Sequence, residues 1–130
     1  MTADGRNPLR YDCEKSGCFN LIMRARLEEF ADCFPGRISM GDVDGIVEIN
    51  GRVLFMEWKG LNAGAISMGQ RILHERLSAI PKVTVILVRG DPQTMDVKEL
   101  TVMRNGKALP TEKIDLARLK SRIAAWARTA

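Results

Sequence analysis

The residue types and spacing best suited to chemistry belong to three side chains, Asp44, Glu57 and Lys59. Carboxylate oxygens are ligands that Mg²⁺ and Mn²⁺ prefer, and these ions keep bound water molecules that can act as nucleophiles. In a strand, Lys59 returns to the face of Glu57, where its ammonium can hold or deprotonate a water or balance charge on a phosphate. The three residues therefore predict a divalent-metal site if the fold brings them together.

A β-hairpin is expected to bring them together. Asn50-Gly51 is the pair best suited to a two-residue type I′ turn, because both turn positions need a positive φ angle. The flanking segments are rich in β-branched and aromatic side chains, VDGIVEI over 43–49 and RVLFMEW over 52–58. Counting outward from the turn places Asp44 opposite Glu57, with their Cβ atoms about 4.5–5.5 Å apart. Two carboxylates so placed repel each other, and a divalent cation is one compensation.

Two alternatives stay open at this hairpin. Lys59 could neutralise the two acids as a simple salt bridge, without a metal. Asp42, which the same register places opposite Lys59, could replace Asp44 as the metal ligand if a β-bulge at Gly45 shifts the pairing.

The segments on either side of the hairpin have the apolar spacing of helices. The first is expected to begin at Asn20 and to end at Pro35-Gly36. The second begins with a capping box, with Ser67 as N-cap and Gln70 three residues later, and is expected to end at Ile80. Its expected apolar stripe is formed by Leu73, Leu77 and Ile80, with Gln70 and His74 on the same side.

The rest of the chain completes an α/β pattern with a mixed sheet. Residues 83–88 are continuously apolar, which suits a central strand buried on both faces, and Gly90-Asp91-Pro92 should end it. A weaker strand is expected over 97–104, before a turn at Asn105-Gly106. A last helix should follow Pro110-Thr111, with one apolar face formed by Leu116, Leu119, Ile123 and Trp126.

Composition is that of a single globular domain over residues 1–130, with residues 1–18 as an arm or loop. The chain is 45% hydrophobic and 28% charged, which is too apolar for a disordered chain, and no run is long enough to cross a bilayer. No signal peptide is recognisable, so no membrane association and a cytoplasmic location are expected. The net charge of +4 permits a polyanionic partner.

The number and spacing of the cysteines argue against disulfide bonds and against a structural zinc site. The chain has three cysteines, Cys13, Cys18 and Cys33. An odd count without an export signal favours reduced thiols over disulfides. Their spacing and the lone His74 match zinc-site patterns poorly, so no role is assigned to the three thiols.

With Asp44 before the turn and Glu57-Trp58-Lys59 after it, the hairpin resembles the PD-(D/E)XK nuclease superfamily. The strings GDVDGIVEINGRVLFMEWKG and GQRILHERL are similar to small phage-encoded or prophage-encoded members near the VRR-NUC and Holliday-junction-resolvase groups. The resemblance covers residues 20–89 and implies a restriction-endonuclease-like αβββαβ core flanked by helices. Residues 90–130 would add a C-terminal strand and helix. Val43, not proline, precedes the acid in this chain.

The resemblance implies a Mg²⁺-dependent deoxyribonuclease in which Mn²⁺ can substitute. Asp44, Glu57 and the backbone carbonyl of Trp58 would bind the metal. Lys59 would orient the attacking water or stabilise the charge on the phosphate. Glu28, in the first helix, would bind a metal through water or hold Lys59.

The remaining candidates have a structural interpretation beside the functional one. Gln70 would support the site or contact the nucleic-acid backbone. The alternative for this capping-box residue is that its amide binds a backbone N–H and takes no part in chemistry. His74 is better explained as a core-edge or phosphate-contacting residue than as a base. Basic residues of the last helix form a solvated face first and a nucleic-acid contact second. The candidate nucleic-acid contacts are Lys59, Arg71, His74, Arg118 and Arg122.

The sequence therefore predicts a metal-dependent endonuclease that hydrolyses DNA, with structure-selective or weak sequence preference. So small a domain has little surface with which to enclose a duplex, which favours a homodimer or a larger replication, recombination or packaging partner in a bacterial or phage-infected cell. The alternative is a catalytically inactive module of the same fold that binds nucleic acid or a protein. A small-molecule enzyme lacks support, because the sequence has neither a phosphate-binding glycine fingerprint nor a nucleophile elbow.

Overall fold

The computed structural model describes residues 25–130 of the chain. By its internal contacts the chain divides into two compact units, Met1–Gly41 and Asp42–Ala130. The described part of the first unit contains a 3₁₀ helix, η2 (Leu27–Cys33). The prediction of an α-helix is therefore wrong for these residues, and the predicted start at Asn20 lies outside the described part. None of the η2 residues is buried, so the burial that stabilises most protein α-helices is missing here.

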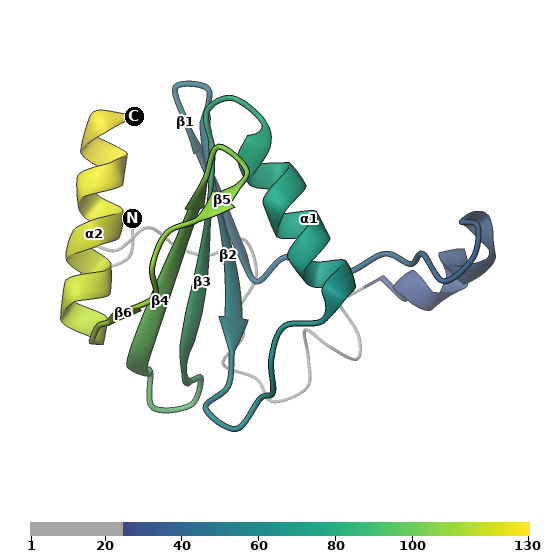
Figure 1. The fold of residues 1–130 in the computed structure, drawn as a ribbon, viewed down its shortest axis with the longest axis horizontal. Helices are drawn as coiled ribbons and strands as arrows, with labels where there is room; N and C mark the ends of the chain where they lie inside the picture. Colours follow the sequence, from purple (N-terminus) through teal and green to yellow (C-terminus); the bar gives the residue numbers. More distant parts are fainter. Residues whose placement is uncertain (1–24) are drawn as a thin grey trace. The chain divides into compact units, whose positions relative to one another are not determined.

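The second unit contains the sheet and both α-helices (Figure 1). Its elements are β1 (Gly45–Ile49), β2 (Arg52–Lys59), α1 (Met68–Ala79), β3 (Val83–Asp91), β4 (Asp96–Arg104), β5 (Lys107–Ala108), β6 (Glu112–Lys113) and α2 (Leu116–Thr129). The sheet is six-stranded in the order β1-β2-β3-β4-β5, with β6 also paired to β4. The α1 and α2 helices lie on opposite sides of it (Figure 1). The predicted α/β class with a mixed sheet is confirmed.

The connection from β2 through α1 to β3 creates the parallel pair of the sheet. The β1–β2 and β3–β4 pairs are antiparallel. The expected core had three strands between its first two helices, whereas the described residues have only β1 and β2 there. Residues 37–44 are exposed and form no strand, so burial does not favour an extended segment at that point of the chain.

In the described part, no helix is long and apolar enough to cross a membrane.

The hairpin turn has the predicted geometry. Asn50 and Gly51 have φ angles of 51° and 84°, as a type I′ turn requires. Ile49 pairs with Arg52, and the pairing continues in unbroken register to Gly45 opposite Met56. The register on which the candidate site depends is therefore confirmed along the whole of β1.

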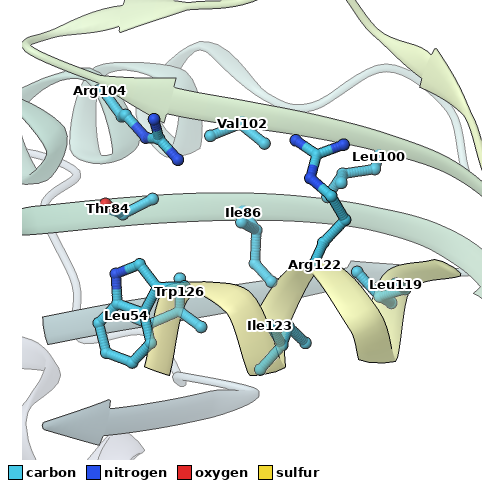
Figure 2. Close-up of a pocket in the computed structure, with 10 residues that line it drawn as sticks. All are labelled: Leu54, Thr84, Ile86, Leu100, Val102, Arg104, Leu119, Arg122, Ile123 and Trp126. Carbon is cyan, nitrogen blue, oxygen red and sulfur yellow. The ribbon is translucent and has the colours of Figure 1, made fainter. Parts of the chain in front are cut away.

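The face of the sheet toward α2 carries the main core. The predicted apolar face of α2 is confirmed, because Leu119 is buried in that core and Leu116, Ile123 and Trp126 pack against it. Figure 2 shows Ile123 and Trp126 of α2 beside Leu54 and Ile86 of the sheet, around a small cavity of about 30 Å³. Arg104 and Arg122 also line this cavity.

The predicted stripe of α1 is wrong in two of its three positions. Leu73 and Ile80 are 49% and 51% exposed, whereas the buried residues of the helix are His74 and Ser78. Ser78 can be buried because its hydroxyl donates to the backbone carbonyl of Glu75, at 3.0 Å. The α1 helix therefore packs on the sheet through a partly polar face that contains His74 and Ser78. Its most apolar face is rotated toward solvent.

The central strand is longer than predicted. The β3 strand has buried residues on both faces, with Val85 and Val88 each 1% exposed, which confirms its expected position. It runs through Arg89 and Gly90 to Asp91, so the predicted break at Gly90-Asp91-Pro92 does end it, three residues beyond the predicted apolar run. The register with β4 shifts between Arg89 and Gly90, because Lys98 of β4 is skipped in the pairing, as in a β-bulge. The two-residue strands β5 and β6 were not predicted, because so short a segment shows no periodic pattern.

Candidate active site

The hairpin brings Asp44 to the end of β2. Extending the observed register by one pair beyond Gly45–Met56 places Asp44 opposite Glu57. The Asp44 carboxylate accepts a hydrogen bond from the backbone N–H of Trp58, at 2.7 Å between Oδ2 and N. Because no bulge displaces Gly45, the geometry favours Asp44 over Asp42 as the partner of Glu57.

Lys59 lies on the same face as Glu57. Its Nζ is 3.3 Å from Oε1 of Glu57, and the two side chains are 23% and 15% exposed. The salt bridge considered from the sequence is thus present, and it also places an ammonium beside two carboxylates. Paired and alternate positions put this group on the face of the sheet that carries α1.

The electrostatics of the group are unfavourable for two ionised carboxylates. Burial raises the pKa of Glu57 above its ordinary value, and the negative charge of Asp44 raises it further. The Lys59 ammonium opposes both effects, and Asp42 adds a smaller increase. Lys59 therefore does not fully offset burial and the charge of Asp44, and a further cation near Glu57 would stabilise its ionised form.

His74 is a buried residue of α1, and the positive charge of Lys59 acts on its imidazole. It is 5% exposed, and its Nδ1 has no hydrogen-bond partner among the described residues. Burial lowers the pKa of His74, and the positive charge of Lys59 lowers it further. The imidazole is therefore neutral near neutral pH, which fits the core-edge interpretation better than that of a cationic phosphate contact.

Trp58 connects the site to the core on the opposite face. Its indole packs against the core, and its Nε1 donates to the carbonyl of Gly90 at 3.1 Å. The backbone N–H of Trp58 points toward Asp44. Because the N–H and C=O of one strand residue face the same neighbour, the Trp58 carbonyl also faces this edge. It is therefore placed at the side of β2 where Asp44 lies.

Arg89 was missed by sequence reasoning. It pairs with Lys59 across β2 and β3. Its guanidinium donates to three backbone carbonyls of the loop that follows Lys59, those of Gly60 at 3.1 Å, Ala63 at 2.7 Å and Gly64 at 3.3 Å. Arg89 thus holds the loop that leads from Lys59 to α1. Only the pairing of β2 with β3, which is not readable from local pattern, could have identified it.

The other predicted residues lie outside this group or serve local contacts. Gln70 is half-buried in the first turn of α1, where its backbone N–H donates to the N-cap Ser67 at 3.2 Å; the cap is confirmed. Arg71 pairs with Glu75 along the helix. Arg122 makes a bidentate contact with Glu112 and lies on the α2 side of the sheet (Figure 2).

Glu28 belongs to η2 in the first unit, and its role stays a prediction. Arg118 is exposed in the first turn of α2. Cys33 is exposed with a free thiol, while Cys13 and Cys18 lie outside the described residues.

The donors present are compatible with Mg²⁺. Within residues 25–130 no group of three or more His, Cys, Asp or Glu side chains could hold a metal ion, so Asp44 and Glu57 form a pair and not a closed protein cage. Mg²⁺ is ordinarily bound by one or two carboxylates, with waters and substrate phosphates completing its shell. The raised pKa of Glu57, caused by burial and by the charge of Asp44, fits such an open site.

Comparison with protein-family models, with curated proteins and with solved structures found no match. The assignment of the candidate site therefore rests on the sequence and geometry of this chain alone.

Proposed function

We propose that this protein is a metal-dependent nuclease that hydrolyses DNA phosphodiester bonds in the cytoplasm. The observation that carries the proposal is the grouping of Asp44, Glu57 and Lys59, in which Asp44 contacts the backbone of Trp58 and Lys59 lies 3.3 Å from Glu57. Two carboxylates and an ammonium at one end of the hairpin are suited to bind a metal ion and a phosphate, and the two carboxylates repel each other when no cation is bound.

In this proposal, Asp44, Glu57 and the Trp58 carbonyl would hold Mg²⁺. The bound ion would supply charge for the phosphate and lower the pKa of a water. The Lys59 ammonium, now 3.3 Å from Glu57, would be released to the phosphate or the water once Glu57 is neutralised by the metal. Arg89 would keep Lys59 in position through the loop Gly60–Gly64.

The test is a cleavage assay on linear, forked, flapped and four-way DNA, with RNA included. Purified wild-type protein should convert at least one DNA substrate to products with Mg²⁺ or Mn²⁺, and EDTA should stop the reaction. A protein that binds these DNAs equally with EDTA or Mg²⁺ and cleaves none of them would instead be a binding module, and the proposal would be wrong.

A further inference from the structure

A row of paired side chains crosses the sheet from the candidate site. Lys59 pairs with Arg89, Arg89 with Glu99, and Glu99 with Lys113. Directly paired residues lie on the same face of a sheet. Lys113 therefore lies in the row of Lys59, three strands away, which is about 14 Å at the usual strand spacing of about 4.8 Å.

A hollow lies at the far end of this row. It has a volume of about 430 Å³ and is lined by Lys98, Glu99, Lys113, Ile114, Asp115 and Arg118. A second hollow, of about 360 Å³, shares Lys113 and Arg118. These two cations therefore lie at the boundary of both hollows, where the start of α2 approaches β6 (Figure 1).

The other charges around the hollow are engaged within the protein. Lys98 pairs with Asp96 at 3.0 Å, and Glu99 lies 4.0 Å from Arg89. Asp115 caps α2 by accepting from the backbone N–H of Arg118 at 2.8 Å. By contrast, Lys113 and the guanidinium of Arg118 form no ion pair with any other residue in the part of the chain that the structure describes.

We propose that Lys113, in the row of Lys59, and Arg118, which α2 brings from the other side to the same hollow at the sheet edge, bind backbone phosphates of the DNA strand that occupies the candidate site. This inference rests on the proposed nuclease function and gives the strand a direction, from Asp44 and Lys59 across the ends of β3 and β4. For a duplex whose axis follows the row, a distance of about 14 Å corresponds to about four base pairs at a rise of about 3.4 Å each. The contacts are to phosphates and carry no sequence preference.

The test is the salt dependence of DNA binding in EDTA, where no cleavage takes place. Binding of a labelled forked DNA is measured by fluorescence anisotropy for wild type and for the double variant Lys113→Ala/Arg118→Ala. Each lost phosphate contact should reduce the slope of log K against log salt by about 0.9, so the double variant should lose about 1.8.

A matched control removes the same two charges elsewhere. Lys107 lies in β5, at the opposite end of β4 from Glu99, and Arg128 lies in the last turn of α2. The variant Lys107→Ala/Arg128→Ala should keep the wild-type slope. The proposal is overturned if both double variants lose the same slope, if Lys113→Ala/Arg118→Ala keeps the wild-type slope, or if wild type does not bind DNA. Thermal melting of each variant checks that it is folded.

The two proposals can fail separately. If wild type cleaves DNA with Mg²⁺ but the slope does not depend on Lys113 and Arg118, the phosphate contacts are wrong and the nuclease proposal stands. If the slope falls as expected but wild type cleaves nothing with any metal, the nuclease proposal is wrong and the binding surface stands as that of a nucleic-acid-binding protein.

Discussion

The Asp44 carboxylate accepts a hydrogen bond from the backbone N–H of Trp58, at 2.7 Å. This contact joins the segment before β1 to the end of β2, just beyond the last pair of the hairpin, Gly45–Met56. It fixes one carboxylate at the end of β2, where the extended register places Asp44 opposite Glu57, and so gives this end of the hairpin two acids. The same contact separates the role of Asp44 from that of its neighbour Asp42.

The variant Asp44→Asn should lose metal affinity while keeping the fold, because an amide oxygen can still accept from the Trp58 N–H. We expect Mn²⁺ binding, measured by isothermal titration calorimetry, to weaken by at least about 10–100-fold, the loss typical of perturbed metal sites. Asp42→Asn is the matched comparison and should weaken binding less. A stronger effect of Asp42→Asn would move the ligand assignment to that residue.

Glu57→Gln should stabilise the metal-free protein near neutral pH. The pKa of Glu57 is raised above 4.5 in the fold, so between 4.5 and the raised value the folded state holds a proton that the unfolded chain releases. Stability therefore falls as pH rises through this window, and the variant avoids that loss. Thermal melts in EDTA should show a higher Tm for Glu57→Gln near neutral pH and no such gain below pH 4.5. An equal difference at both pH values would show that the charge of Glu57 is not the cause.

His74→Leu should change the pH dependence of stability in the opposite direction. The pKa of His74 is lowered from 6.5, so as pH falls below 6.5 the unfolded chain takes up a proton that the folded state does not. Wild type should therefore lose stability relative to His74→Leu between about pH 7.5 and about pH 5.5. Glu57 is present in both proteins, so the difference between their Tm curves isolates the imidazole. Parallel curves would contradict a buried neutral His74.

Gly90→Ala should destabilise the fold by crowding the backbone of β4 and the indole of Trp58. A Cβ at this position would lie 2.7 Å from the carbonyl oxygen of Asp96, 3.0 Å from Cα of Val97 and 3.1 Å from Cζ2 of Trp58. Crowding of this kind costs about 1–3 kcal/mol, to be measured by urea unfolding. Gly69→Ala is the control, because a Cβ there meets nothing within 4 Å and an alanine in α1 should stabilise by about 0.5–1 kcal/mol. Equal stabilities for the two variants would show that the backbone around Gly90 shifts to accept a Cβ at little cost, and would contradict this prediction.

Local chemistry explains what the sequence could predict. The positive φ angles needed by Asn50-Gly51 determine the turn, the turn determines the register, and the register brings Asp44 to Glu57. The apolar face of α2 could also be predicted, because its apolar residues recur at helical spacing and all pack against one core.

Non-local contacts explain what the sequence could not predict. The burial of His74 and Ser78 in place of Leu73 depends on how α1 is rotated against the sheet, and a helix with polar groups on its inner line gives no apolar signal of that rotation. The hydrogen bonds from Arg89 to the loop after Lys59 form only because the parallel pairing of β2 with β3 places Arg89 beside Lys59. Such contacts follow from the assembled sheet and not from the spacing of residues along the chain.

The measurement that tests the central claim most directly is Mg²⁺-dependent DNA cleavage by wild type, Lys59→Ala and Lys120→Ala. Lys120 is an exposed lysine of α2 and serves as the control for the loss of one positive charge. We expect Lys59→Ala to retain its fold and to cleave about 10²–10⁴-fold more slowly than wild type, the range for loss of a positioned catalytic group, while Lys120→Ala cleaves at the wild-type rate. Cleavage by Lys59→Ala at the wild-type rate would contradict a site built from Asp44, Glu57 and Lys59.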